Sequence, residues 1–148
     1  MELDPEHVVR NAYKVAEEQD VPGWNALFTE DGTFTDTSIG VTYRGEHLGD
    51  TVEVYAKAFP DMHRELFQVY VTGNIVVVQL ALQGTHTGPL PTPMGVLPAT
   101  GNRMDAPCCD VFEIVAGKIK RFDCYPAGTI IFSQLGVLAD IQAAVVRV

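Results

Sequence analysis

The feature that most constrains the fold is a pair of apolar segments separated by a two-residue turn. Residues 104–115 and 118–125 have the composition of β-strands, and Ala116-Gly117 between them leaves room only for a hairpin turn. Pro126 ends the second strand, because proline cannot donate to a strand ladder. This stretch therefore predicts an antiparallel hairpin.

An acidic residue lies inside the first of these strands. Asp110 stands between Cys109 and Val111, and strand alternation places it on one face with Ala106, Cys108, Phe112 and Ile114. A charged carboxylate is costly to bury without a partner, and burial raises the pKa of a carboxyl group. We therefore predict that Asp110 is a protonated acid facing a pocket. The structural alternative is a carboxyl group satisfied by a buried hydroxyl or a backbone amide.

The rest of the chain supplies helices first and strands afterwards. Asp4-Pro5 has the residues of a helix N-cap and first turn, and Asp20 can cap a second, shorter helix. An apolar stripe that ends at Phe59, before Pro60, predicts a third helix. In chain order, the expected elements are helices at 5–16 and 20–28, a turn at 29–32, a strand at 33–37, a loop at 38–44, a helix at 48–59, strands at 62–71 and 75–87, an apolar proline-rich loop at 88–100, the hairpin, a helix at 127–135 and an apolar tail at 137–148.

This order predicts an α+β fold with a single domain over residues 1–148. The short hairpin loops favour an antiparallel sheet. Three helices packed on the concave face of a curved sheet would form a cone with an apolar pocket. The composition, 47% hydrophobic and 20% charged, is that of a folded globular chain.

Charge and hydrophobicity narrow the classes of partner. A net charge of −9 argues against nucleic acid and anionic membrane surfaces, both of which attract basic proteins. No apolar run is long enough to span a bilayer. The first residues lack the basic and apolar regions of a signal peptide, which predicts a cytoplasmic protein.

Neither a metal nor a cofactor is expected. The three cysteines, Cys108, Cys109 and Cys124, lie in apolar segments without the C-x-x-C or histidine spacing of a metal site. They are predicted to be buried free thiols. The sequence contains no P-loop, no G-x-G-x-x-G and no G-x-S-x-G, so a nucleotide cofactor and a covalent serine mechanism are not expected.

Three further polar residues are candidates for acid/base chemistry. Asp36, near the end of the strand at 33–37, could remove a proton next to a carbonyl group or could cap a turn. His86 ends a core-facing row of the strand at 75–87 and could move a proton, or could be a hydrogen-bonded histidine of the fold. Tyr13 could donate to a substrate or fill the seam between helix and sheet. The aromatic residues expected to line the pocket and contact a substrate are Trp24, Phe34, Tyr55, Phe112 and Tyr125.

The order of elements and several short strings resemble the nuclear transport factor 2-like superfamily, and most closely its SnoaL-like polyketide cyclases and ketosteroid isomerases. The similarity runs from about Val8 to Gly136. It is carried by the order and spacing of LFTEDGTFTD (27–36), AFPDMHRE (58–65), GTHTGPL (84–90), PATG (98–101), CDVF (109–112), GKI (117–119) and SQLG (133–136).

This resemblance implies roles for several positions. Asp36 matches the general-base aspartate of the isomerases, and Asp110 matches their protonated aspartate. Tyr13 approximates the tyrosine of their first helix, and Tyr55 falls near a supporting tyrosine. The cyclases place their main acid/base aspartate seven residues before the glutamine of Gln-Leu-Gly, where this chain has Ala127.

Together these observations predict a cofactor-free acid/base enzyme of the polyketide cyclase or isomerase type. It would act through an enolate on a small hydrophobic carbonyl compound, by intramolecular aldol cyclisation or by isomerisation. Ala127 motivates an alternative, a non-catalytic binder of a hydrophobic metabolite. A second alternative, water addition to an epoxide, would need a polar cluster such as Arg121 with Asp123, which strand alternation points away from the pocket. The apolar loop at 88–100 and the open sheet face predict a homodimer, as the resemblance also implies.

Overall fold

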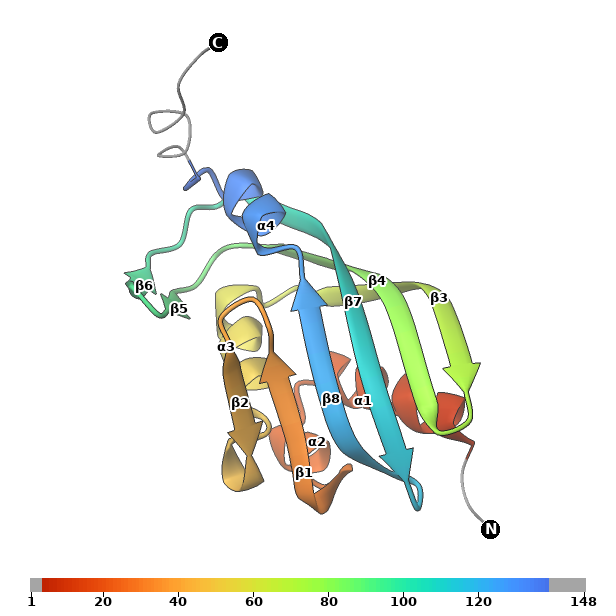
Figure 1. Cartoon of the computed structure of the whole chain (residues 1–148). Coiled ribbons are helices and arrows are strands. Elements are labelled where there is room, and N and C mark those ends of the chain that lie inside the picture. Colours follow the sequence, from red (N-terminus) through yellow and green to blue (C-terminus); the bar gives the residue numbers. More distant parts are fainter. Residues whose placement is uncertain (1–3, 139–148) are drawn as a thin grey trace.

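A curved six-stranded sheet forms the body of the computed structural model, which describes residues 4–138 (Figure 1). The strands are β1 (Phe28–Asp36), β2 (Val41–Arg44), β3 (His63–Thr72), β4 (Ile75–Thr85), β5 (Leu90–Thr92), β6 (Gly95–Leu97), β7 (Arg103–Val115) and β8 (Lys118–Pro126). The large sheet has the strand order β2-β1-β8-β7-β4-β3, whereas β5 and β6 form a separate hairpin.

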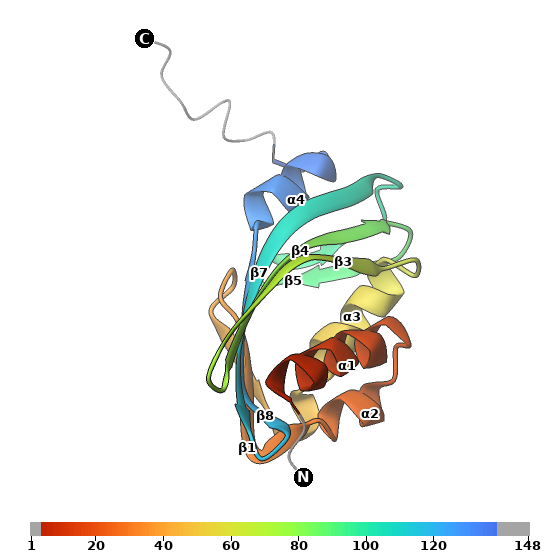
Figure 2. The same cartoon turned by 90° about the vertical axis from the view of Figure 1, so that its right-hand side faces the viewer.

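Three helices cover the concave face of this sheet: α1 (Pro5–Glu17), α2 (Val21–Asn25) and α3 (Asp50–Ala58). Figure 2 shows the sheet bending around them. A 3-10 turn, η1 (Gly45–His47), precedes α3, and a fourth helix, α4 (Gly128–Gln134), follows β8 and packs against β7. The predicted fold, a curved sheet with three helices on its concave face, is confirmed. Within residues 4–138, no helix has both the length and the apolar character needed to cross a membrane.

Local sequence explains where α1 begins and which face it buries. Asp4 Oδ1 accepts a hydrogen bond from the backbone N–H of Glu6 at 3.2 Å, and Pro5 occupies the first turn. Side chains at helical spacing face the sheet and are buried: Val8, Val9, Ala12, Tyr13 and Ala16. This face brings the Tyr13 side chain against β7.

The hairpin of β7 and β8 forms as predicted. Ala116 (φ 50°) and Gly117 (φ 75°) both lie in the left-handed region, as a two-residue type I′ turn requires. Because β7 pairs antiparallel with both β4 and β8, it is a central strand of the sheet. Its residues alternate between a buried and a more exposed face, and Asp110 lies on the buried face.

The sheet is mixed, so the prediction of a wholly antiparallel sheet is wrong. β1 pairs parallel with β8, and Phe34 lies opposite Phe122 and Asp36 opposite Cys124. Short hairpin loops dictate antiparallel pairing only between strands that follow each other in the chain. Since β1 and β8 are far apart in sequence, no such loop sets their relative direction.

Three shorter segments also differ from the prediction. β1 begins at Phe28 and includes the predicted turn, because an irregularity in register between Phe28 and Thr33 absorbs those residues. β2 occupies part of the predicted loop at 38–44 and pairs with β1. The proline-rich segment at 88–100 contains the β5–β6 hairpin. The predicted tail at 137–148 lies almost wholly outside the described residues.

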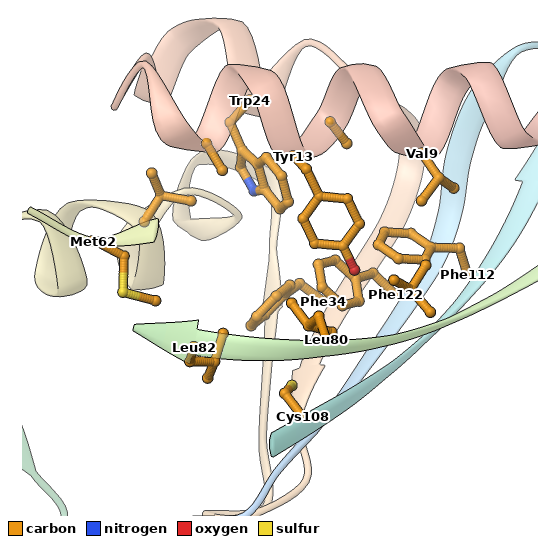
Figure 3. Packing of buried hydrophobic residues seen from close by; sticks show 14 of the residues in the cluster. Val9, Tyr13, Trp24, Phe34, Met62, Leu80, Leu82, Cys108, Phe112 and Phe122 are labelled. Carbon is orange, nitrogen blue, oxygen red and sulfur yellow. The ribbon is translucent and has the colours of Figure 1, made fainter. Parts of the chain in front are cut away.

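Aromatic side chains fill the seam between the helices and the sheet (Figure 3). The ring of Phe122 lies at the centre, with its centroid 4.2 Å from that of Phe112 and 4.6 Å from that of Phe34. Tyr13 meets Phe112 edge-on at 5.9 Å, and Trp24 is 5.9 Å from Phe122. Such contacts add to the stabilisation from burial, and they fix the positions of the rings that surround Tyr13.

We expect Phe112→Ala to lower the free energy of unfolding by about 3–5 kcal/mol, because the ring is fully buried and its removal leaves a cavity. Urea unfolding followed by circular dichroism measures this loss. Val115→Ala, on the same strand but 40% exposed, is the matched control and should change stability by roughly 0.5 kcal/mol or less. Equal losses for the two variants would contradict the assignment of Phe112 to the core.

Candidate active site

Two adjoining cavities lie on the concave side of the sheet. The outer cavity has a volume of about 680 Å³ and is lined by the β1–β2 loop, α3, the β5 hairpin and α4. The inner cavity has a volume of about 50 Å³ and is lined by side chains from α1, α2, α3 and the sheet. Both are lined by Asp36, Thr51, Tyr55 and Pro126, so the two cavities form one funnel that narrows toward Asp110.

Asp110 lies at the narrow end of the funnel and is 3% exposed. Its Oδ2 accepts a hydrogen bond of 2.6 Å from the Tyr13 hydroxyl, and its Oδ1 accepts one of 3.3 Å from the Cys108 thiol. Burial raises the pKa of the Asp110 carboxyl group, although these hydrogen bonds and the charge of Arg64 act in the opposite direction. Asp110 therefore faces a pocket in apolar surroundings, as predicted. A buried hydroxyl group also hydrogen-bonds to it, as the structural alternative proposed.

Tyr13 reaches the same carboxyl group from α1. Burial raises its pKa well above the usual value, and the neighbouring Asp110 raises it further. The phenol therefore keeps its proton at neutral pH and acts as a hydrogen-bond donor in the inner cavity. The structure brings together these two predicted site residues, which are 97 positions apart in the sequence.

Asp36 lines both cavities and is 8% exposed. Its Oδ1 accepts hydrogen bonds from the backbone N–H of Ser38 at 3.0 Å and from the Ser38 hydroxyl at 2.6 Å. This is the turn-capping arrangement that the sequence left open as an alternative. Within residues 4–138, no hydrogen bond engages Oδ2, so one oxygen holds the turn while the other stays available to a ligand.

A single row across the sheet relates the two carboxyl groups. Cys124 on β8 lies opposite Asp36 on β1 and also opposite Asp110 on β7. Residues directly opposite each other project to the same side of a sheet, and neighbouring strands are about 4.8 Å apart, so the two aspartate Cα atoms are about 10 Å apart. Asp36 and Asp110 therefore face the inner cavity from strands on either side of β8.

The predicted aromatic residues divide into three groups. Trp24, Phe34 and Tyr55 line the inner cavity, and the Trp24 indole N–H donates to the Leu48 carbonyl at 3.0 Å. Burial raises the pKa of Tyr55, so this phenol too keeps its proton. Phe112 lines neither cavity and packs behind Tyr13. Tyr125 is 49% exposed and also lines neither cavity, because strand alternation turns it away from the concave face.

His86 lies outside both cavities and is fully buried. Its Nδ1 accepts a hydrogen bond of 3.1 Å from the Thr100 backbone N–H, which assigns the proton of the neutral ring to Nε2. Burial lowers the pKa of His86, which favours this neutral form. In the described part of the chain, no hydrogen bond links His86 to Asp36 or Asp110, and the geometry fits a histidine of the fold.

Arg64 is the inner-cavity residue that the sequence analysis missed. It begins the concave face of β3 and lies opposite Leu82 of β4, another residue of the cavity wall. Its position in AFPDMHRE, two residues before Leu66 and with the same strand parity, was the available signal. A charged residue near the start of an edge strand is usually solvated, so the pattern alone did not single it out.

Two thiols surround the inner carboxyl group. The ligand atoms of Cys108, Asp110 and Cys124 all lie within 4.8 Å of one another, and the two sulfur atoms are 3.6 Å apart. Metal binding requires thiolates. The mutual hydrogen bond raises the pKa of the Cys124 thiol and lowers that of the Cys108 thiol, but burial and the neighbouring Asp110 raise both, and both pKa values lie above the usual value. The arrangement therefore favours a hydrogen-bonded cluster of neutral thiols around Asp110.

Other candidates of the sequence analysis lie away from the inner cavity. Ala127 lines the outer cavity, so this wall presents a methyl group where the resemblance implies an aspartate. Arg121 and Asp123 form an ion pair with 2.8 Å between Nε and Oδ2, and neither residue lines either cavity. No observation in the described residues connects this pair with the funnel.

Comparison with known protein families now identifies the chain. Residues 9–122 match the family profile described as the SnoaL-like domain. This chain belongs to the SnoaL-like family. No curated protein sequence matches it.

Solved structures with the same architecture include other SnoaL-like proteins. One assigned by name to the SnoaL-like polyketide cyclases, from Jannaschia sp. CCS1, is 20% identical and has a TM-score of 0.77, with 93% of this chain and 94% of that chain covered. IdmH from Streptomyces antibioticus, assigned to the polyketide cyclases, is 20% identical with a TM-score of 0.76 over 91% and 100% of the two chains. A third structure is that of a protein with a ketosteroid isomerase-like fold from Catenulispora acidiphila DSM 44928, in complex with trimethylamine. It is 19% identical and has a TM-score of 0.74, with 90% of this chain and 95% of that chain covered. At these identities the similarity shows a shared fold.

The raised pKa of Asp110 predicts a pH-dependent difference in stability between the wild type and Asp110→Asn. Because the folded-state pKa lies above the usual value of 3.8, the folded chain holds this proton at pH values where the unfolded chain has lost it. Relative to the variant, the wild type should be most stable below pH 3.8, lose stability as pH rises through the folded-state pKa, and then level off.

Urea unfolding at several pH values, from about 3.5 to about 8, measures this difference. Asp105→Asn, which alters an exposed carboxylate on the same strand, is the matched control. A pH trend for Asp110→Asn that does not exceed the trend of the control would contradict a protonated Asp110.

Proposed function

We propose that this SnoaL-like domain is a cofactor-free acid/base enzyme that acts through an enolate on a small hydrophobic carbonyl compound. The observation that carries the proposal is the pairing of two unlike carboxyl groups in one cavity. Asp36 has one oxygen without a hydrogen bond in the described chain, whereas Asp110 is buried and bonded to Tyr13. A carboxylate oxygen without a hydrogen bond can accept a proton, and a buried carboxyl group that keeps its proton can donate a hydrogen bond.

The funnel suits a substrate with one polar end. The outer cavity, of about 680 Å³, lies within the size range of small-molecule sites, and its wall includes Ile39, Val54, Leu90, Ile131 and Phe132. The inner cavity, of about 50 Å³, admits only a small group. In the proposed complex, the carbonyl group enters the inner cavity and the apolar remainder of the substrate fills the outer one.

In the proposed reaction, Asp36 Oδ2 removes a proton from the carbon next to the carbonyl group. The electron pair of the broken C–H bond moves onto the carbonyl oxygen, and protonated Asp110 donates a hydrogen bond to the resulting enolate. The Tyr13 hydroxyl keeps donating to Asp110 Oδ2 and so helps to hold this acid in place. Asp36 then returns the proton, either to a different carbon in an isomerisation or to the alkoxide that forms when the enolate attacks a second carbonyl group. Both outcomes leave the protein in its starting protonation state.

A specific observation favours a second candidate function, non-catalytic binding. The outer wall carries Ala127 where the resemblance implies an aspartate, so the funnel could hold a hydrophobic metabolite without transforming it. Proton exchange separates the two functions, because a binder would hold an apolar ketone without exchanging its α-protons.

We expect wild-type protein to accelerate the exchange of α-protons of an enolisable aryl ketone with deuterated solvent, as followed by NMR. Asp36→Asn and Asp110→Asn should each slow this exchange at least about tenfold, since each removes a group that acts only along the reaction. Asp105→Asn, which alters an exposed carboxylate that lines neither cavity, should leave the rate within about twofold. Binding of the ketone without exchange would favour the binder. Accelerated exchange that neither aspartate change slows would overturn the proposed roles of Asp36 and Asp110.

We also propose that two copies of the chain associate, with the exposed end of β3 in the interface. Phe67, Tyr70 and Val71 are 56%, 53% and 45% exposed, an unusual concentration of large apolar side chains on an edge strand. Sedimentation of the wild type should give a dimer, and Phe67→Ser with Tyr70→Ser should give monomers. Val137→Ser, which changes an exposed apolar side chain beyond α4 and away from β3, is the control. A wild type that is monomeric at all concentrations would overturn the proposal.

A further inference from the structure

Arg64 is the one cationic side chain that lines either cavity within the described residues. It lies on β3, opposite Leu82, and is only partly exposed. The other ionisable residues of the inner cavity are Asp36, Asp110, Tyr13, Tyr55 and Cys124. A permanent positive charge therefore faces a small chamber that otherwise holds apolar, phenolic, thiol and carboxyl groups.

The guanidinium group of Arg64 has no protein partner in residues 4–138. In the part of the chain that the structure describes, no carboxylate lies within 4.0 Å of it, although Asp36 and Asp110 line the same cavity. Glu17 Oε1 accepts a hydrogen bond of 2.6 Å from the backbone N–H of Arg64, and Glu17 Oε2 contacts His63 Nδ1 at 3.2 Å. Glu17 is thus engaged by a backbone N–H and by His63, and within residues 4–138 the guanidinium group donates no hydrogen bond to a protein acceptor.

An unpartnered cation in such a place has an energetic cost. Burial lowers the pKa of Arg64, since desolvation disfavours the charged form, while the charges of Glu17 and Asp110 act in the opposite direction. Arginine nevertheless keeps its proton at all physiological pH values. Desolvation of a charge is offset when counter-charges and hydrogen bonds complete its environment. Glu17 and Asp110 supply part of this compensation, but within residues 4–138 no acceptor is hydrogen-bonded to the guanidinium group.

We propose that Arg64 binds a carboxylate group of the substrate, so that the ligand class of this site is an oxo carboxylic acid with an apolar tail. This inference rests on the proposed function, because it names the substrate class of the same funnel. The planar fork of a guanidinium matches the two oxygens of a carboxylate. Because Arg64, Tyr13 and Asp110 line one cavity of about 50 Å³, the carboxylate and the reacting carbonyl group are close neighbours in the substrate.

The binding of 2-oxo-4-phenylbutanoate and of its methyl ester tests this inference. The two probes share the oxo group and the phenyl tail and differ in the negative charge. Trp24 is the single tryptophan of the chain and lines the inner cavity, so its fluorescence reports binding of either probe. Wild-type protein should bind the acid at least about tenfold more tightly than the ester, as expected for a charge-assisted hydrogen bond.

Arg64→Met should remove this preference. The affinity for the acid should fall at least about tenfold, while the affinity for the ester should stay within about twofold of the wild-type value. Arg64→Lys, which keeps the charge without the planar fork, should retain part of the preference. Arg10→Met is the matched control, because Arg10 is half exposed on α1 and pairs with Glu6 away from the cavities. Should Arg64→Met fold poorly, Arg64→Gln gives the same comparison with a polar side chain.

Equal binding of acid and ester by the wild type, or a preference for the acid that survives in both Arg64→Met and Arg64→Gln, would overturn the inference. Its failure is distinguishable from failure of the proposed function. The α-proton exchange of the neutral ester tests Asp36 and Asp110 without Arg64, whereas the acid-to-ester affinity ratio tests Arg64 without any reaction.

Discussion

A hydrogen bond of 2.6 Å joins the Tyr13 hydroxyl on α1 to the carboxyl group of Asp110 on β7, in a seam otherwise filled by aromatic and aliphatic side chains. Neither polar group has access to bulk water there, so each depends on the other to avoid an unsatisfied buried atom. The pair therefore fixes the rotation of α1 over the sheet. With α1 held in that position, its apolar face covers the sheet on one side, and the space toward α3 remains open as the inner cavity.

Different structural elements form the inner and the outer part of the funnel. The row that contains Asp36, Cys124 and Asp110 belongs to the sheet, whose ladder hydrogen bonds hold the polar groups at set spacing. The outer wall is made by the β1–β2 loop, the β5 hairpin and α4, which contribute mostly apolar side chains. The proposed acid/base groups thus belong to the hydrogen-bonded sheet, whereas the loop, hairpin and helix around it would contact the bulk of a ligand.

Sequence reasoning succeeded where the relevant physics is local. Side-chain alternation placed Asp110 on the buried face of β7, and the Ala116-Gly117 turn set the register of its hairpin. Sequence reasoning failed where two distant segments meet, because the residues of neither strand indicate that β1 and β8 pair in parallel. Composition alone also does not distinguish an aromatic residue of the cavity wall, such as Phe34, from one packed behind the wall, such as Phe112.

Arg64 illustrates the same limit for a charged residue. On an edge strand such a side chain normally extends into water. Figure 2 shows the curvature of the whole sheet. On the concave side of this curved sheet, Arg64 lines the inner cavity. His86 shows the converse, because a core-facing histidine at a strand end looked available for proton transfer, yet the segment that contains Thr100 folds over and holds it. In both cases the decisive partner or enclosure comes from a part of the chain remote in sequence.

The parallel pairing of β1 with β8 has a consequence for how the protein is made. Asp36 leaves the ribosome early and Asp110 much later, and the strand that lies between them, β8, is synthesised after both. Pairings between such distant segments form slowly, because a long loop must close before any contact offsets the entropy lost. The nascent chain therefore cannot bring Asp36 and Asp110 into one row before β8 inserts between their strands, so the proposed acid/base pair forms late in folding.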